Sequence, residues 1–368
     1  MPGTVSSLEL FPPLTRSGLR QFLTSAWYPK FQRSTIKTTT IPLDDAFRAY
    51  MHADGVTIPR GADDRLVVRI LRPAGSMLSD DEGDDGDDGD DDPSSVFEFP
   101  DLDRSIREAI AAYDGAVFPK LNWSAPKDAR WISPSPPLRC LSPADVYLLI
   151  KSSDFVSHGI DAATAFEACI DNDATVNPHS ASHDGLPLEL VLKKYYVMQE
   201  SREVRCFVRR NILVAISQRD PNYYEFWNED ATQTKIRQTV AELFQREIQQ
   251  RWEGPTDYVV DLLLTRDLNR AHIIDFNPYA PRTDSLLFTF DELLAIAEDE
   301  VLQTQLPVLR AIDSRNHPSA ARNTPQYAHN MVPLDLIQAS AGQDYAGFAG
   351  NWEDAIREAM AKQQDDSD

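Results

Sequence analysis

Hydrophobic and polar residues along this chain follow two periods, and these periods predict where its strands and helices lie. Short apolar runs bounded by turn residues predict strands over residues 65–71, 116–121, 188–195, 204–210, 213–219, 258–265 and 271–276. Apolar residues three and four apart predict helices over 101–113, 143–151, 232–249 and 291–298, and a further helix is expected over 351–362. The connection at residues 210–212 is too short for a crossover, so strands joined in this way pair antiparallel. The pattern predicts an α+β fold with mixed, mainly antiparallel sheets and flanking helices.

An acidic run interrupts this pattern near the first predicted strand. Residues 80–92 hold ten acidic side chains broken only by three glycines. Such a segment has no apolar surface to bury, so we expect a disordered, solvated loop over about residues 78–95. Contact with an ion or a basic partner is the alternative, but no glutamate ends a twelve-residue loop as an EF-hand requires.

Two further irregular stretches mark the other boundaries. Residues 171–187 carry His179 and His183, four apart, but the prolines and glycine around them disfavour the helix that would turn both toward one metal. We interpret them as loop histidines. Residues 314–333 separate the main body from a C-terminal segment. We therefore expect an N-terminal lobe over 1–187, a second lobe over 188–312, and a C-terminal extension over 313–368 with one helix and an acidic tail.

Composition and charge narrow the class of protein. The chain has 368 residues, with 42% hydrophobic and 26% charged side chains, which is typical of a globular protein. Its net charge of −22 argues against general nucleic-acid binding, which depends on neutralising phosphates. No apolar run reaches the roughly 18–20 residues that span a bilayer, and the first thirty residues lack the pattern of a secretory signal. Cys140, Cys169 and Cys206 have neither zinc-site nor disulfide-framework spacing. We therefore expect buried or incidental thiols in the reducing environment of the cytoplasm.

Two apolar strands near the end of the second lobe each carry acidic or amide side chains. If the ladder between them closes with Thr265 opposite Ala271, Asp261 lies opposite Asp275. Asn277 then lies two residues further along on the same face, because side chains alternate along a strand. The sequence therefore predicts that three oxygen-bearing side chains converge on one face of a hairpin.

Such a set of side chains suits a divalent cation. Two carboxylates directly opposite one another repel unless a cation lies between them. Asp261, Asp275 and Asn277 supply three hard oxygens and leave positions for water and phosphate, which favours Mg²⁺. The alternative is structural: these residues could cap strands or pair with the nearby Arg266 and Arg282.

Basic side chains follow other strands of the same lobe. Lys193 and Lys194 end one apolar strand, Arg205 lies within the next, and Arg219–Asp220 follows a third. Cations on adjacent strands could converge on a polyphosphate. They could equally be ordinary edge charges that balance the surrounding acids.

A proline-rich loop after the strand at 116–121 offers another candidate. Lys120 enters this loop, where Asn122, Trp123 and Ser124 follow. The lysine could reach a phosphate, and the indole could pack or support a base. The loop superficially resembles the K-x-D-G motif of covalent nucleotidyl transferases, but Asn122 and Trp123 replace the aspartate and glycine. A covalent lysine–nucleotide adduct is therefore not expected.

Together these segments resemble the cell-division-cycle-123 family. The segments that carry the resemblance are FPKLNWSAPKDARWI (118–132), LLIKSSDF (148–155), LELVLKKY (188–195), EVRCFVRRNILVAISQRD (203–220), YVVDLLL (258–264), IIDFNP (273–278) and TDSLLFTFDEL (283–293). They occur in one order over residues 118–293 almost without a break, and the N-terminal hundred residues are less similar.

The resemblance implies a fold and a function. Members of that family are similar to ATP-grasp proteins, bind ATP with Mg²⁺ between two lobes, and assist assembly of eukaryotic translation initiation factor 2. The partner implied is the gamma subunit, which the protein helps to join the alpha and beta subunits, and the protein itself is expected to be a monomer. An ATP-binding chaperone without turnover of a small substrate is the favoured interpretation. The alternative is an ATP-grasp ligase that couples a carboxylate to an amine.

The resemblance also assigns roles to residues of this chain. Near the phosphates it places Lys120 and Asn122, with Trp123, Ser124 and Ala125 completing that loop. As a linker whose backbone meets the adenine edge it implies Glu189, Leu190 and Val191. Facing phosphates or ribose it implies Lys193, Arg205, Arg219 and Asp220. At the metal it implies Asp261, Asp275 and Asn277.

Overall fold

The computed structural model describes residues 8–62, 97–132, 137–170, 186–299, 301 and 305–320. The strand predicted over 65–71, the acidic run at 80–92, most of the stretch 171–187 and the helix predicted over 351–362 lie outside the described residues. The chain divides into two compact units, Met1–Asn323 and Thr324–Asp368, and the elements described here belong to the first. Within the described ranges, no helix has the length and apolar character needed to cross a membrane.

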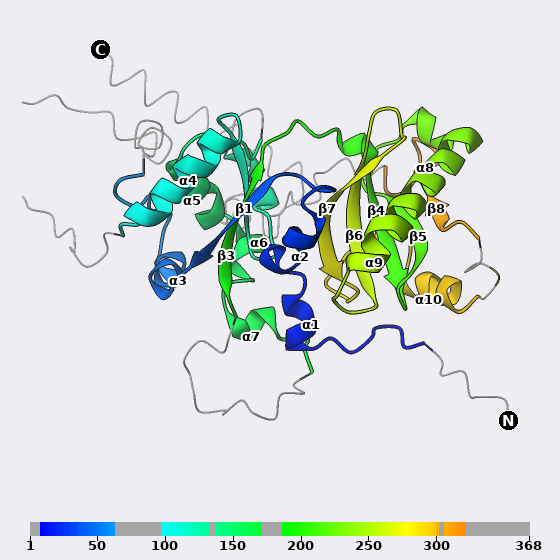
Figure 1. Ribbon diagram of the computed structural model, residues 1–368, viewed down its shortest axis with the longest axis horizontal. Helices are drawn as coiled ribbons and strands as arrows, with labels where there is room; N and C mark the ends of the chain where they lie inside the picture. The colour runs from blue at the N-terminus through cyan, green and yellow to red at the C-terminus, as the bar shows by residue number, and fades with distance from the viewer. Residues whose placement is uncertain are drawn as a thin grey trace, which may run out of the picture. The chain divides into compact units, whose positions relative to one another are not determined.

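Two β-sheets organise the first unit (Figure 1). The smaller sheet has the strand order β1 (Thr38–Leu43), β3 (Leu188–Lys194), β2 (Val117–Leu121), with antiparallel pairing throughout. The larger sheet has the order β7 (Ala271–Pro278), β6 (Tyr258–Leu264), β4 (Glu203–Arg209), β5 (Ile212–Gln218), β8 (Val308–Arg310). Its pairs are antiparallel except β5 with β8. The predicted α+β class with mainly antiparallel sheets is confirmed.

The chain passes from one sheet to the other over residues 195–199, before the short 3₁₀ helix η4 (Glu200–Arg202). Strand β3 is the central strand of the smaller sheet, although the predicted boundary at 187/188 groups it with the second lobe. The change of sheet therefore comes after Lys194. The division into three domains stays a prediction.

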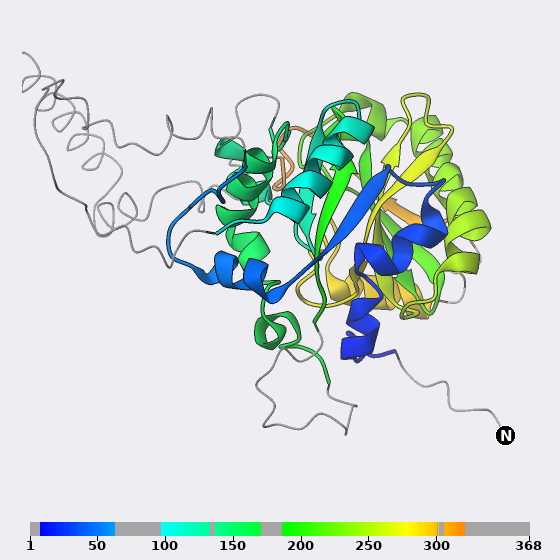
Figure 2. The same cartoon turned by 60° about the vertical axis from the view of Figure 1, so that its left-hand side comes forward.

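Alternation along β3 separates a core face from a polar face. Leu188, Leu190 and Leu192 belong to the core that the smaller sheet shares with helices α3 (Asp45–His52), α4 (Pro100–Ala112) and α5 (Pro143–Lys151). Figure 2 shows these helices grouped on one side of the sheet. Glu189 and Lys193 are also buried, but they alternate with the leucines and lie on the opposite face. That face is where the smaller sheet meets residues of the larger one.

The larger sheet has a core on each face. On one face, apolar residues of β4, β6 and β7 pack against α8 (Asp230–Leu243) and α2 (Thr24–Phe31). The helix predicted over 232–249 is present, but it continues from α8 as a π-helical turn (Phe244–Ile248) and α9 (Gln249–Arg251). On the other face, Phe207 and Val259 pack against α10 (Phe290–Glu298). Along β4 and β6, Arg205 and Asp261 alternate with residues of the first core, so their side chains lie on the second face.

Helix α2 lies between the two sheets (Figure 1). Its N-cap residue, Leu23, offers no side-chain acceptor, and the buried Glu189 carboxylate of β3 accepts a hydrogen bond from Ser25 N at 3.2 Å instead. A carboxylate at a helix N-terminus is stabilised by the helix dipole and satisfies a free N–H group. Further along α2, Trp27 contacts Phe276 of β7 edge to face. The helix therefore joins β3 of one sheet to β7 of the other.

Candidate functional site

The β6–β7 hairpin brings the predicted metal ligands together. Asp261 lies opposite Asp275, as predicted, and Asn277 lies opposite Val259. The predicted starting point of the ladder is wrong by one residue, because Leu264 and not Thr265 lies opposite Ala271. A register shift between Asp261 and Leu262 leaves Ile274 as an extra residue on β7, and this bulge restores the predicted pairing at the aspartates.

Arg205 on the adjacent strand β4 neutralises Asp261. Arg205 lies opposite Asp261 in the ladder, and its Nε and Nη2 atoms donate to Oδ1 and Oδ2 of the carboxylate, each at 2.8 Å. Asn277 Nδ2 also donates to Oδ2 at 3.4 Å, and Arg219 Nε lies 3.6 Å from it. Burial would raise the pKa of the Asp261 carboxyl, but the charges of Arg205 and Arg219 outweigh it and hold that pKa well below its usual range.

Arg219 connects this pair to a second carboxylate. It directly follows β5, and its Nη1 atom donates to Glu203 Oε2 at 2.5 Å while its backbone N–H donates to Glu203 O at 3.1 Å. Glu203 is buried and begins β4. The guanidinium therefore lies between the carboxylates of Glu203 and Asp261, where charge-assisted hydrogen bonds are strong.

Two buried lysines of the smaller sheet reach the same place from the opposite side. Lys120 of β2 forms an ion pair with Asp275. Lys193 of β3 donates from Nζ to Ile274 O at 2.6 Å, and this carbonyl belongs to the bulged residue that the ladder leaves unpaired. Burial lowers the pKa of Lys193 to about 8, although the nearby Asp275 carboxylate opposes this shift. The two lysines link the sheets through polar contacts to β7.

We call this arrangement the two-sheet cluster. It has three carboxylates and five cations, and four of the cations were predicted from the sequence. Its carboxylates are Glu203, Asp261 and Asp275, and its cations are Lys120, Lys127, Lys193, Arg205 and Arg219.

Lys127 is the cation that the sequence analysis missed. It begins the 3₁₀ helix η3 (Lys127–Trp131), and Arg219, Glu203, Asp261 and Arg205 all act on its charge. Burial and, next, Arg219 lower the pKa of Lys127 to about 8. Its presence in the FPKLNWSAPKDARWI segment was a signal, but only the fold shows that charges of the larger sheet act on it.

The oxygens of the hairpin fit a hard divalent cation. Asp261, Asp275 and Asn277 lie on one face, and Asn277 Nδ2 donates a hydrogen bond to Asp261, so the polar atoms of these two side chains lie together. Among the described residues, no group of three or more His, Cys, Asp and Glu side chains could hold a metal ion on its own. Such a donor set suits Mg²⁺, which often takes one or two carboxylates together with phosphate oxygens. Metal binding by these residues stays a prediction.

Asn122 lies next to the cluster, but its side chain is committed elsewhere. It is fully buried and has a left-handed φ of 45°, which asparagine tolerates better than most residues. Its Oδ1 atom accepts from Glu189 N at 2.8 Å, and its Nδ2 atom donates to Gly159 O at 3.3 Å. The amide therefore fixes the loop after β2, and a contact from it to phosphate would require one of these bonds to break.

Glu189, Leu190 and Val191 do not form a linker between the lobes. They lie in the middle of the central strand β3 and pair with β1 on one side and with the end of β2 on the other. Asn122 N also donates to Glu189 O at 3.0 Å. The backbone groups of these residues are thus paired within the sheet, and their contact with an adenine edge stays a prediction. The resemblance implies that these three residues form the linker between the lobes. In the structure, residues 195–199 connect the two sheets instead.

The remaining predicted residues have local roles. Asp220 accepts from Asn222 N at 3.0 Å and from the Tyr224 hydroxyl, so its carboxylate organises the turn after β5. Ser124 and Leu121 exchange two backbone hydrogen bonds of 2.9 Å and close the loop after β2. Trp123 packs at the edge of the larger core, and Ala125 O accepts from Lys127 N at 2.8 Å. Nucleotide contacts from these residues stay predictions.

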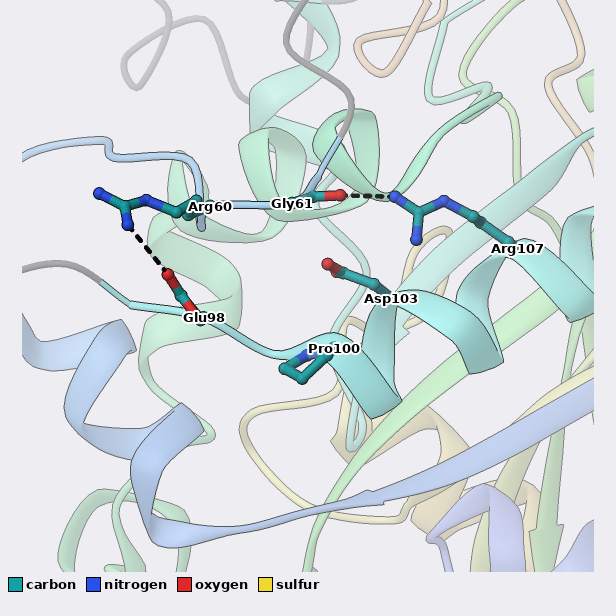
Figure 3. Close-up of a pocket in the computed structure, with 6 residues that line it drawn as sticks. All are labelled: Arg60, Gly61, Glu98, Pro100, Asp103 and Arg107. Atoms are coloured by element: carbon teal, nitrogen blue, oxygen red, sulfur yellow. Dashed lines mark hydrogen bonds and ion pairs between the residues drawn. The ribbon is translucent and has the colours of Figure 1, made fainter.

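A separate cavity of about 360 Å³ lies at the start of α4 (Figure 3). None of the predicted site residues lines it. Its charged groups have partners: Arg60 pairs with Glu98 at 3.4 Å, Arg107 donates to Gly61 O at 2.6 Å, and Asp103 accepts from Tyr147. The two-sheet cluster therefore remains the stronger candidate for ligand binding.

Known proteins resemble this chain over most of its length. The family model described as D123 matches residues 27–340. A protein of Aspergillus niger named translation initiation factor eIF2 assembly protein is 34% identical over 365 residues, which cover 97% of this chain and 92% of that protein. A protein of the same name from Schizosaccharomyces pombe is 34% identical over 346 residues, covering 93% of this chain and 97% of the relative. The solved structure of Cdc123 from Schizosaccharomyces pombe matches with a TM-score of 0.61 and 31% identity, over 82% of this chain and 99% of that one.

The Arg205–Asp261 pair can be tested by a double-mutant cycle. Both side chains are almost fully buried, so Arg205→Met leaves an uncompensated carboxylate, and we expect it to lower the free energy of unfolding by about 3–5 kcal/mol. Adding Asp261→Leu should recover much of that loss. Arg251→Met, which removes a more exposed pair with Glu247, is the control and should change stability by less than about 1 kcal/mol. Equal effects of Arg205→Met and Arg251→Met in urea denaturation would contradict the assignment.

The lowered pKa of Lys193 gives a pH dependence with a definite sign. Between about pH 8 and its ordinary pKa of 10.5, the unfolded chain holds the lysine proton more tightly than the folded chain. The free energy of unfolding therefore rises with pH, and between pH 8 and 9.5 this lysine should contribute a rise of about 1.5 kcal/mol. Urea denaturation of the ligand-free protein should show that Lys193→Met lacks this rise, while the exposed control Lys235→Met retains it. A parallel pH dependence in Lys193→Met and the unmodified protein would refute the assignment.

Proposed function

This chain belongs to the D123 family, and we propose that it is an assembly factor for translation initiation factor eIF2 that binds ATP with Mg²⁺ at the two-sheet cluster. The resemblance to the cell-division-cycle-123 family is confirmed, and with it the ATP-grasp-like α+β fold. The names of the relatives in Aspergillus niger and Schizosaccharomyces pombe support the assembly role. The charges of the two-sheet cluster support the proposed binding of ATP with Mg²⁺.

The observation that carries the nucleotide proposal is the excess of positive charge in the cluster. Its five cations face three carboxylates, within a chain whose net charge is −22. A buried surplus of cations is unfavourable unless an anion joins it. A polyphosphate supplies several negative oxygens at once, and both lysine and arginine bind phosphate strongly.

A magnesium ion would bind beside these cations. Asp275 and Asn277 would hold the ion together with Asp261, and the ion would neutralise part of the phosphate charge. Asp275 is now paired with Lys120. When the carboxylate turns to a metal, the lysine becomes free to bind a phosphate oxygen, so one exchange of partners serves both ligands.

Binding at this position would act on the relation between the two sheets. The cluster takes Lys120 and Lys193 from the smaller sheet and its three carboxylates and Arg205 from β4, β6 and β7 of the larger sheet. Arg219 directly follows β5, and Lys127 lies on η3. A ligand changes a conformational population only through its different affinity for the two states. We propose that ATP favours the arrangement of the sheets that binds the gamma subunit of eIF2, and that no small substrate is turned over.

Removal of Asp275 tests the metal part of the proposal. We expect Asp275→Ala to weaken binding of Mg–ATP at least about 10-fold and to lower assembly of eIF2, while circular dichroism shows a retained fold. Asp275→Asn is the milder variant, and Asp267→Ala, in the exposed turn of the same hairpin, is the matched control. Titration calorimetry measures the affinity, and capture of the gamma subunit with and without Mg–ATP measures the partner interaction.

Two outcomes would overturn parts of this account. Unchanged nucleotide affinity in Asp275→Ala would refute the metal assignment. Rapid ADP release that depends on an added small acid or amine would favour the ATP-grasp ligase over the assembly factor.

A further inference from the structure

Two arginines of helix α1 (Arg16–Arg20) lie over one aromatic ring. Arg16 and Arg20 are four residues apart and therefore lie on the same side of the helix. Their guanidinium carbons lie 5.4 and 5.5 Å from the ring centre of Phe166. This phenylalanine directly follows helix α7 (Ala162–Ala165), so α1 lies beside the end of α7 (Figure 1). Contact with the ring fixes the orientation of each guanidinium.

A third guanidinium reaches the same place from the loop after β7. Arg282 donates from Nη1 to Ala165 O at 3.1 Å, next to the phenylalanine. Two residues later, Asp284 O accepts from Arg205 Nη1 at 2.8 Å, so this loop adjoins the two-sheet cluster. We call the three side chains at the end of α7 the arginine group. Its members are Arg16, Arg20 and Arg282.

The backbone that carries the arginine group is held in place. Thr15 caps α1, because its hydroxyl accepts from Gly18 N at 3.0 Å. Leu14 O accepts from Ile170 N at 2.9 Å, and Thr15 and Ile170 form a parallel bridge. These bonds tie the start of α1 to the segment after α7. Side chains on such a support lose little conformational entropy when they bind a partner.

Two members of the arginine group have no carboxylate partner. The Nε atom of Arg20 is buried without a hydrogen-bond partner, and within the described ranges no acid forms an ion pair with Arg20 or Arg282. Of the acids on and beside α7, Asp161 is paired with His52 at 3.1 Å, and Glu167 is exposed. A buried N–H group without an acceptor is costly, and an anion that accepts from it removes the cost.

The surroundings of the arginine group favour an acidic peptide as the anion. Arg16 and Arg20 are partly exposed and Arg282 is exposed, so an extended segment can approach them. Guanidinium groups bind carboxylates with two parallel hydrogen bonds. The net charge of −22 opposes a nucleic acid, and it repels an acidic protein segment from most of the surface. A local group of arginines would therefore decide where such a segment docks.

We propose that the arginine group is a docking site for an acidic segment of a protein partner, whose carboxylates Arg20 and Arg282 bind. The site lies outside the two-sheet cluster, and the inference does not depend on the proposed nucleotide binding. The loop that carries Arg282 also contacts Arg205 of the cluster. A partner docked at the arginine group is therefore placed beside the proposed ligand site.

The test uses the full chain and a fluorescein-labelled peptide of alternating glutamate and glycine. Fluorescence anisotropy at low salt measures its affinity, and the same peptide with glutamine in place of glutamate is the uncharged control. We expect the glutamate peptide to bind at least about 10-fold more tightly than the glutamine peptide. Arg20→Gln and Arg282→Gln should each weaken the glutamate peptide about 5- to 10-fold, the effect of losing one charge-assisted contact.

Arg246→Gln makes the same charge change at an exposed arginine of the π-helical turn and should alter the affinity by less than about twofold. Equal affinities in Arg20→Gln, Arg282→Gln and Arg246→Gln would overturn the inference, as would no preference of the unmodified protein for the glutamate peptide. A loss confined to Arg20→Gln and matched by a lower melting temperature would show that Arg20 only holds α1 on Phe166. Displacement of the peptide by micromolar phosphate would identify a phosphate site instead, and the docking proposal would then be wrong.

Discussion

The candidate site depends on the buried pairing of Arg205 with Asp261. Three adjacent strands place this pair: β4 supplies the arginine, β6 the aspartate, and β7 the side chains beside them. The carboxylate is held charged in the protein interior because two guanidinium hydrogen bonds offset its loss of water. A buried ion pair is weak evidence for stability, because well-packed apolar residues often serve as well. The pair lies near Lys193, whose pKa is lowered by burial, and such a grouping of buried charges points to function.

The second constraint is the junction between the sheets. Lys120 and Lys193 extend from the polar side of the smaller sheet to an aspartate and a bulge carbonyl of β7, and α2 bridges the same two sheets. Apolar packing of each sheet against its own helices is separate from these polar contacts. The junction therefore includes two lysines whose protein partners a charged ligand can replace. This is a physical reason for ligand binding to alter how the sheets meet.

Sequence reasoning recovered the strands between residues 116 and 278 and the face on which the aspartates meet, because side-chain alternation and hydrophobic period are local properties. It missed the helices α2 and α3 near the N-terminus. It also missed β1, where threonine and proline weaken the strand pattern, and β8, which has only three residues. It could not anticipate the bulge at Ile274, since nothing local marks an extra residue in a ladder. The same limit applies to Asn122 and Glu189, whose side chains hold a loop and a helix end. Hydrogen-bond partners distant in the chain decide which polar residues remain free, and that information is not in a single segment.

The central claim is that the charges of the two-sheet cluster exchange protein partners for a nucleotide and a metal ion. A crystal structure of the protein with Mg²⁺ and a non-hydrolysable ATP analogue tests it most directly. We expect Lys120 to have left Asp275 for a phosphate oxygen, with the metal on Asp261, Asp275 and Asn277 and the Arg205–Asp261 ion pair retained. An analogue bound elsewhere, or bound here with the Lys120–Asp275 pair intact, would contradict it.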